Sequence, residues 1–197
     1  MSSEKRKYEL KARADSQNRT RERIVRAAME LHEEVGPAQT TIAEIARRAG
    51  VQRLTVYNHF PQEPQLLGAC QGHWLSLHPP PDPAAALGLS DPFERVRAVL
   101  GDFYAWYHET RPTAEKVQRD RGVLAPLDEL LQQTADVGLA QLSDALAAGF
   151  ADRGRAAVRR RALILLALDF WTWRRLAGQG LDDDEAAALM ADAVAAT

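Results

Sequence analysis

The chain has 197 residues, with 25 Lys and Arg against 27 Asp and Glu, and its formal net charge is -2. This average argues against nucleic acid as a partner, because a domain that grips phosphates usually carries a positive surplus. A hydrophobic fraction of 46% excludes wholesale disorder, and the single cysteine, Cys70, excludes a disulfide framework or a cysteine-based zinc cluster. The sequence has no apolar run of membrane-spanning length and no signal-peptide core, so we expect a cytoplasmic protein without a membrane partner.

The N-terminal part of the chain predicts three successive helices. Between Thr20 and the stop at Gly36-Pro37, apolar residues repeat at helical spacing: Ile24, Ala27, Ala28, Leu31 and Val35. Thr41 and Glu44 have the spacing of a capping box, which predicts reciprocal side chain–amide hydrogen bonds at the start of a short helix over 42–49. Gly50 supplies the positive φ that ends this helix, and a third helix is predicted over 52–59.

The rest of the chain also shows helical periodicity. A fourth helix is predicted from Pro64 to about Leu77, followed by an irregular connector, HPPPDPAAALGLSDP. Asp91-Pro92 begins a fifth helix, which Arg111-Pro112 is expected to end. Further helices are predicted over 113–120 and 126–150, within the apolar segment 155–177, and over 181–195. No segment shows strand alternation, so the predicted fold class is all-α.

Charge is distributed unevenly along the chain. Residues 1–60 hold 12 Lys and Arg against 8 Asp and Glu, a surplus of +4, whereas residues 61–197 hold 13 against 19, a deficit of -6. Such asymmetry is typical of a nucleic-acid-binding end on an otherwise acidic chain. The average of -2 therefore hides a basic N-terminal part.

Two short helices separated by Ala49-Gly50-Val51, after a longer first helix, have the order of a helix-turn-helix. In that motif the second short helix presents its N-terminal side chains to base edges in the major groove. If Val56 and Phe60 point inward, the remaining side chains are candidate base readers with suitable hydrogen-bonding or methyl-contacting chemistry: Gln52, Arg53, Leu54, Thr55 and Asn58. Tyr57 and His59 are candidate donors to phosphate.

This stretch resembles the DNA-binding domain of the TetR family of bacterial transcriptional regulators. The resemblance rests on ordered elements at the family's spacing: Thr40-Thr41, Ile45-Ala46, Ala49-Gly50-Val51 and Tyr57-x-His59-Phe60, followed by Leu66-Leu67. It implies a homodimer on a pseudo-palindromic double-stranded operator, with a C-terminal domain that binds a small effector and dimerises through its last two long helices. Carried over by position, Arg53, Leu54, Thr55 and Asn58 are base-reading residues, and Thr41, Thr55, Tyr57 and His59 contact phosphate.

Two positions depart from the family pattern. Glu63, followed by Pro64, stands where the family commonly has a phosphate-contacting Lys, so we expect no phosphate contact at this position. Leu54 replaces a small residue, and it either reads a methyl group or packs. A basic arm with Arg13, Arg19, Arg21 and Arg23 could compensate by entering the minor groove; for residues 1–17 the alternative is a solvated tail.

These observations predict three parts: a flexible basic arm at 1–17, a three-helix DNA-binding domain at 18–66, and an effector-binding and dimerisation domain at 67–197. Aromatic crowding suggests an effector pocket lined by Phe103, Trp106, Tyr107, Leu127, Leu131 and Trp171, although core packing is the alternative for each of these residues. Apolar residues in the last two helical segments predict a dimer interface formed by Leu163, Leu166, Phe170, Leu189, Met190 and Val194.

The expected function is that of a sequence-specific transcriptional regulator, a repressor released from its operator by a small molecule. One alternative is a ligand-independent dimeric DNA-binding protein. A remote alternative is an all-α enzyme, but no spacing of the five histidines, Cys70 or the carboxylates suggests a triad, a metal site or a phosphate loop. We therefore predict no catalytic residues, no metal and no cofactor.

Overall fold

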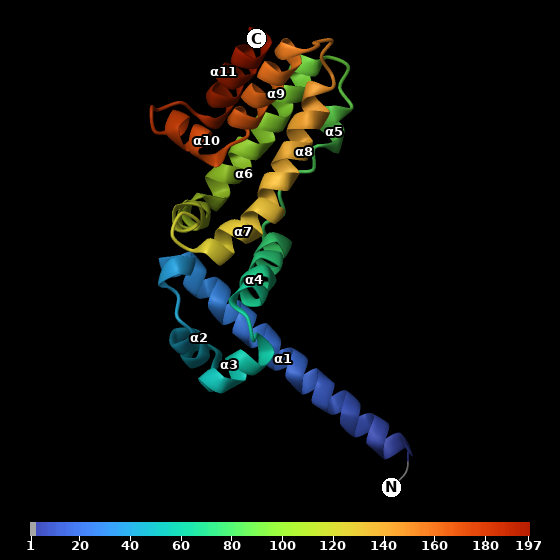
Figure 1. Ribbon diagram of the computed structural model, residues 1–197, viewed down its shortest axis with the longest axis vertical. Helices are drawn as coiled ribbons and strands as arrows, with labels where there is room; N and C mark the ends of the chain where they lie inside the picture. The colour runs from blue at the N-terminus through green and yellow to red at the C-terminus, as the bar shows by residue number, and fades with distance from the viewer. Residues whose placement is uncertain (1–2) are drawn as a thin grey trace. The chain divides into compact units, whose positions relative to one another are not determined.

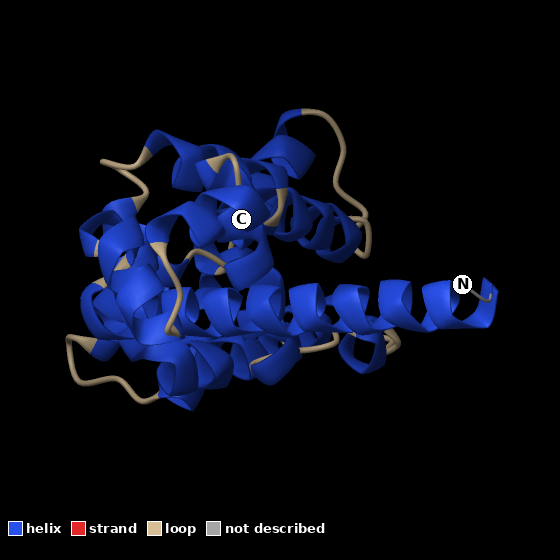
Figure 2. Cartoon of the chain, turned by 90° about the horizontal axis from the view of Figure 1, so that it is seen from below, coloured by secondary structure: helices blue, strands red, loops and turns tan. Residues whose placement is uncertain are grey.

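The computed structural model describes residues 3–197, with side chains for 7, 8 and 10–197, and every regular element in this range is a helix (Figure 2). This confirms the predicted all-α class. The elements in chain order are α1 (Ser3–Val35), the short 3-10 helix η1 (Pro37–Gln39), α2 (Ile42–Ala49), α3 (Arg53–His59), α4 (Glu63–Leu77), α5 (Ala84–Leu87), α6 (Pro92–Asp120), α7 (Ala125–Gln133), α8 (Ala135–Ala147), α9 (Arg155–Ala167), α10 (Phe170–Ala177) and α11 (Asp183–Ala195). None of these helices combines the length and the apolar character that a bilayer-spanning helix requires.

The chain folds into two compact units whose boundaries differ from those expected from the sequence. The first unit comprises Met1–His78 and Glu115–Leu130, and the second comprises Pro79–Ala114 and Leu131–Thr197. The division therefore does not fall at residue 66, because α4 packs along α1 and buries Leu66 and Cys70 in the core of the first unit. The last turns of α6 also join the first unit, which local periodicity does not indicate.

In the first unit, α2 and α4 pack on the C-terminal half of α1, and α3 packs on α2 (Figure 1). Its core contains the apolar stripe of α1 and the inner residues of the three shorter helices: Ile24, Val25, Ala27, Ala28, Leu31, Ile45, Ala46, Ala49, Val56, Phe60, Leu66 and Cys70. Removing this apolar surface from water is the main force that fixes the three shorter helices, because helices of seven or eight residues are marginal on their own.

In the second unit, a bundle of α6 and α8–α11 encloses an aromatic core. Tyr104 and Tyr107 on α6 are buried, yet their hydroxyls donate to the carbonyl oxygens of Ala167 (2.8 Å) and Leu168 (2.7 Å) at the end of α9. Trp173 is also buried, and its indole N–H donates to Asp183 on α11 at 2.9 Å. These bonds satisfy the polar atoms that the aromatic side chains carry into the core.

Residues 3–17 differ from the sequence prediction. They continue α1 to Ser3 rather than forming a separate flexible arm, while residues 1 and 2 lie outside the described range. Residues 3–19 contain neither Gly nor Pro and are rich in Lys, Arg, Glu and Ala, which favour helix. The prediction missed this extension because it relied on apolar periodicity, which begins only at Ile24.

Helix ends in the second half of the chain also differ from expectation. Pro112 does not end α6, which continues to Asp120, since a single proline removes only one backbone hydrogen bond and the helix has buried residues before it, at Tyr107, and after it, at Asp120. The segment expected as one helix over 126–150 is broken at Thr134, where φ is -121° and ψ is -82°. The apolar segment is broken at Asp169, whose carboxylate caps α10 by accepting from the Thr172 amide at 2.9 Å. The Pro-rich connector contains the one-turn helix α5.

Candidate nucleic-acid interface

The turn between α2 and α3 is built on Gly50. This glycine has φ 64° and ψ 42°, in the left-handed region that disfavours residues with a Cβ. The Gly50 amide donates to Arg47 (3.2 Å) and the Val51 amide donates to Ala46 (2.9 Å), which is the pairing of a Schellman motif. The chain therefore leaves α2 in a fixed direction, and that direction sets where α3 begins.

Arg23 on α1 holds the same turn from the other side. Its Nε and Nη2 donate to the carbonyl oxygen of Ala49, with an Nε distance of 3.1 Å, and Nη2 also donates to Gly50 at 3.1 Å. A cation at the C-terminus of α2 satisfies carbonyl groups that have no helical partner and opposes the negative end of the helix dipole. The expected place of Arg23 in an arm for the minor groove is wrong, because its guanidinium is used inside the unit.

Arg21 is likewise engaged within the unit. Its guanidinium carbon lies 4.2 Å from the centroid of the Phe60 ring, and Phe60 is buried at the end of α3. This cation–π contact ties α1 to the C-terminus of α3. Of the four arginines expected to form a compensating arm, Arg13 and Arg19 lie on the exposed N-terminal part of α1.

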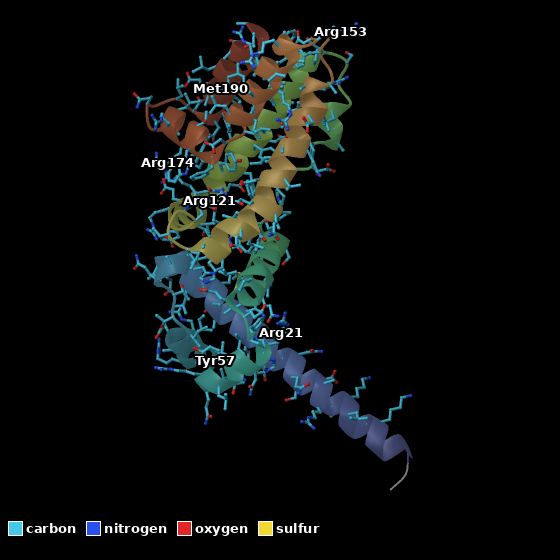
Figure 3. The ribbon with its side chains drawn as sticks, viewed as in Figure 1. Arg21, Tyr57, Arg121, Arg153, Arg174 and Met190 are labelled. Atoms are coloured by element: carbon cyan, nitrogen blue, oxygen red, sulfur yellow. The ribbon has the colours of Figure 1, made fainter. Side chains whose placement is uncertain are left out.

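Tyr57 projects from α3 (Figure 3), and apart from Thr41 the predicted DNA-contacting residues lie on this helix or at its N-terminus. Val56 is fully buried and Phe60 nearly so, which fixes the rotation of the helix. Leu54 is 66% exposed and Tyr57 is 52% exposed, so Leu54 does not pack within this chain. The remaining predicted residues of this segment are exposed (Gln52, Arg53 and Asn58) or half-buried (Thr55 and His59).

Thr41 caps α2, but the predicted capping box is only half formed. The Thr41 hydroxyl accepts from the Glu44 amide at 3.2 Å, which leaves its own proton available to a phosphate oxygen. The Glu44 carboxylate does not reach back as predicted; it accepts from the Arg47 guanidinium at 2.9 and 2.5 Å. That hydrogen bond holds the pKa of Glu44 below its usual range.

The ion pair of Arg48 with Glu34 and the carboxylate of Glu63 are two charged features beside the helix-turn-helix. Arg48 on α2 makes a bidentate pair with Glu34 on α1, at 2.6 and 2.8 Å, so Arg48 joins helices. Glu63 is exposed in the first turn of α4, followed by Pro64, where a carboxylate is favourable against the helix dipole. The absence of a phosphate contact at Glu63 stays a prediction.

At the C-terminal end of α1, the buried carboxylate of Asp120, the Arg119 guanidinium and the Ala38 amide form a hydrogen-bonded cluster that we call the clasp. Asp120, only 3% exposed, accepts from Arg119 Nε at 2.7 Å and from the Ala38 amide at 3.0 Å. Gly36 has φ 95°, and a Cβ there would collide with the Asp120 carboxylate and lie 2.6 Å from Arg119 Nη2. No local signal in the sequence points to this role of Asp120, since Ala38 lies more than eighty residues earlier in the chain.

His32 lies in the last turn of α1 beside this clasp. Burial lowers its pKa to about 4, although the charge of Asp120 acts in the opposite direction. Burial also acts to raise the pKa of Asp120, but the hydrogen bonds from Arg119 and the Ala38 amide outweigh it and hold that pKa below its usual range. At neutral pH the clasp therefore contains an ionised carboxylate and lies beside an uncharged imidazole.

The residues expected to line an effector pocket have different surroundings. Phe103 and Tyr107 belong to the packed aromatic core of the second unit, and Trp106 is half-buried against it. Leu127 belongs to the first unit, and Leu131 is buried in the second. Trp171 is 44% exposed and borders a surface hollow of about 350 Å³ with Arg174, Arg175, Gly178 and Gln179. For Phe103 and Tyr107 the structure thus favours core packing.

The residues expected at a dimer interface divide into two groups. Phe170 and Val194 are buried in the core of their own chain, so neither can form an interface face, and this part of the prediction was wrong. Leu166 on α9 and Leu189 on α11 are about half exposed, at 54% and 49%, while Leu163 and Met190 are partly buried. Helices α9 and α11 contact each other, and Val158 adds a further exposed apolar residue to α9.

Two kinds of reactive site are relevant among the described residues, metal-binding clusters and a nucleophilic thiol. Within the described residues, no group of three or more His, Cys, Asp or Glu side chains could hold a metal ion. Cys70 is buried with its thiol 3.7 Å from the Val25 carbonyl, and burial raises the pKa of the thiol to about 12. A thiol with that pKa stays protonated and unreactive near neutral pH.

The fold and the exposed α3 define a helix-turn-helix protein, and known proteins share this region. The profile described as bacterial regulatory proteins, tetR family, matches residues 24–70. A curated relative from Pseudomonas putida, described as the uncharacterized HTH-type transcriptional regulator TtgW, is 37% identical over 86 residues, which are 42% of this chain. The match spans 61% of that relative's length. The helix-turn-helix region, residues 24–70, therefore matches the TetR family, as its motif predicted.

Solved structures extend the likeness in fold to most of the chain. A transcriptional regulator from Rhodococcus sp. Rha1 is 18% identical, with a TM-score of 0.60 over 88% of this chain and 95% of that one. NalD of Pseudomonas aeruginosa, described as the secondary repressor of the MexAB-OprM multidrug efflux pump, is 22% identical, with a TM-score of 0.59 over 92% and 96% of the two chains. At these identities the likeness establishes a shared fold.

Proposed function

We propose that this chain is a transcriptional repressor that acts in the cytoplasm and reads a pseudo-palindromic operator as a homodimer. The observation that carries the proposal is the outer face of α3, where Gln52, Arg53 and Asn58 stand exposed on a helix held by the Gly50 turn and by Arg23. The match of residues 24–70 to the TetR family supports the same function and agrees with the expectation that the chain is not an enzyme.

On this proposal the residues of the motif divide into two roles. Arg53, Gln52 and Asn58 have the donors and acceptors that pair with base edges, and Leu54 and Thr55 supply methyl groups for contact with thymine. Thr41, Tyr57 and His59 donate to phosphates and set the position of α3 in the groove. The exposure of Leu54 supports the methyl-reading alternative over the packing alternative.

The exposed apolar residues of the second unit support a homodimer. Leu166 and Val158 on α9 leave more than half of their surface in water, and Leu189 on the contacting helix α11 leaves nearly half. Covering these residues with the same surface of a second copy would remove them from water, which is a favourable and self-complementary arrangement. A two-fold dimer would then present two copies of α3 to half-sites roughly 34–36 Å apart.

Release by a small effector is the finer part of the proposal and rests on what the family implies. One observation favours the ligand-independent alternative: Tyr104 and Tyr107 are packed, and both hydroxyls are satisfied by backbone carbonyls. The hollow beside Trp171 favours an effector, since Arg175 and Gln179 would place polar groups next to an exposed indole. A library of small molecules tested for release of bound operator separates these two functions.

The test of the main proposal is selection of binding sites from random duplex DNA by the full chain, followed by binding measurements at several salt concentrations. We expect an inverted repeat to be enriched. If each subunit neutralises about four phosphates, the slope of log K against log salt should be about -7. Failure to enrich any sequence, together with no binding of duplex DNA at low salt, would falsify the proposal.

A further inference from the structure

Helix α1 is much longer than the core of its unit requires. It runs for 33 residues from Ser3 to Val35, but its first buried residue is Ile24. Every described side chain from Lys7 to Arg19 is exposed, and Figure 1 shows this part of the helix continuing past α3 and α4. About half of the helix therefore stands in water without packing partners in its own unit.

The composition of this extension does not explain its stability. Tyr8 and Leu10, the large apolar side chains of this extension, are 74% and 62% exposed, so the extension gains little from burial and depends on propensity and on weak side-chain pairs. Residues 3–23 contain eight Lys and Arg against four Asp and Glu, and Lys5, Arg6 and Lys7 fall near the N-terminus. Positive charge at that end opposes the helix dipole. An anionic surface alongside the extension would relieve both the charge repulsion and the unfavourable dipole interaction.

Helical periodicity indicates which side of the extension continues the buried stripe of α1. Thr20, Gln17 and Arg13 precede Ile24 at intervals of four, three and four residues, so they extend the buried stripe of α1 toward the N-terminus. The cation–π contact of Arg21 with Phe60 marks where α3 ends along α1. Arg13 lies eight residues before Arg21, which is about 12 Å along the helix and comparable to the width of the major groove. Lys11 projects from the opposite side of α1.

We infer that the extension of α1 binds the phosphate backbone of the DNA that flanks the bases read by α3, with Arg13 as its main contact. This inference rests on the proposed function. Duplex DNA fits because it is a continuous polyanion adjacent to α3, and because a rigid helix can cross a backbone although it cannot thread into the minor groove as a flexible arm would. The extension thus lengthens each half-site without reading additional bases.

The test compares two duplexes that share the selected operator: one trimmed to the bases contacted by α3, and one with a further ten or so base pairs on each side. Arg13→Ala should weaken binding to the long duplex about 3- to 10-fold and should leave binding to the trimmed duplex within twofold. It should also reduce the magnitude of the slope of log K against log salt for the long duplex by about 0.9 for each phosphate that is no longer neutralised. Hydroxyl-radical footprints of the wild-type chain should show flanking protection that this variant lacks.

Lys11→Ala is the matched control, because it removes the same charge from the same exposed helix on the opposite side. It should leave both duplexes within twofold of wild type. Equal losses for Lys11→Ala and Arg13→Ala would overturn the inference in favour of non-specific attraction, and no loss for either would also overturn it. A change in sedimentation with Arg13→Ala, without a change in footprint, would identify a second copy of the chain as the partner instead.

Arg53→Ala separates failure of this inference from failure of the proposed function. It should weaken binding to both duplexes, since it removes a contact made by α3 itself. If Arg53→Ala acts on both duplexes and Arg13→Ala acts on neither, α3 reads DNA and the extension does not. If the wild-type chain binds neither duplex, both the function and the inference are wrong.

Discussion

The guanidinium of Arg23 on α1 donates to the carbonyl oxygen of Ala49, 26 residues further along the chain, and thereby caps the C-terminus of α2. The same guanidinium reaches Gly50, so one side chain holds both the end of α2 and the turn that orients α3. The orientation of α3 therefore depends on α1 as well as on the residues of the motif.

Arg23→Ala should lower the free energy of unfolding by about 1–2 kcal/mol, because it removes charge-assisted hydrogen bonds to two carbonyls. Binding to all operator sequences should weaken as well, since α3 is no longer fixed. Arg26→Ala is the control, because Arg26 is an exposed arginine on the same helix. Thermal unfolding and anisotropy measurements check both effects, and equal behaviour of the two variants would contradict the role assigned to Arg23.

Gly36→Ala should destabilise the chain by more than about 2 kcal/mol, since it combines a left-handed backbone with a collision at Asp120. Gly72→Ala is the matched comparison. Gly72 is exposed within α4, and a Cβ there meets nothing within 4 Å, so this change should stabilise by about 0.5–1 kcal/mol. Urea unfolding of the two variants should show shifts of opposite sign.

The stability of the protein should fall as pH is lowered from 6.5 to 4. The pKa of His32 is about 4 in the folded chain and near 6.5 when unfolded, so within this window the unfolded chain binds a proton that the folded chain does not. The loss assigned to this group is on the order of 2–3 kcal/mol by linkage. His32→Gln should reduce the dependence of the unfolding free energy on pH between 6.5 and 4. If this dependence is unchanged in the variant, other titrating groups cause the loss of stability.

Arg53→Ala and Tyr57→Phe should have different effects on sequence preference. Loss of Arg53 should relax the choice of base at one position in each half-site, at a cost of about 1–3 kcal/mol for the preferred base. Loss of the Tyr57 hydroxyl should instead weaken binding to all sequences alike, because a phosphate contact carries no base information. Binding to a set of single-base operator variants distinguishes the two patterns.

Leu166→Glu should convert the proposed dimer to a monomer, because a carboxylate would be buried at the centre of the apolar interface. Val137→Glu on α8 is the control, since Val137 is similarly exposed, at 45% against 54% for Leu166. Sedimentation at micromolar concentration measures the outcome. A wild-type chain that sediments as a monomer would contradict the interface itself.

Local signals in the sequence predicted the motif closely. The periodicity of Ile42, Ile45 and Ala46 and the glycine at position 50 gave α2 its observed bounds, and the inward positions Val56 and Phe60 gave the rotation of α3. These signals succeed because caps, left-handed turns and amphipathic stripes depend on residues within a few positions of one another. The exposure of the predicted reading residues follows from the same stripe.

Long-range contacts were not predictable in this way. Nothing near Arg23 indicates that it pairs with Ala49, and nothing near Asp120 indicates that it accepts from the Ala38 amide. Phe170 and Val194 have the apolar character of interface residues, and only their burial within the chain excludes that role. The continuation of α6 through Pro112 likewise reflects packing rather than local propensity.

The sequence by itself determined that the chain is all-α, that its helix-turn-helix resembles that of the TetR family, and that the net charge of -2 conceals a basic N-terminal part. Only the tertiary structure decided what that basic charge does. Arg21 and Arg23 hold α3 in place, whereas Arg13 and Arg19 remain exposed on an extended α1. The physical reason is that charge is a property of composition, but the partner of each charge is fixed by packing between segments distant in the chain.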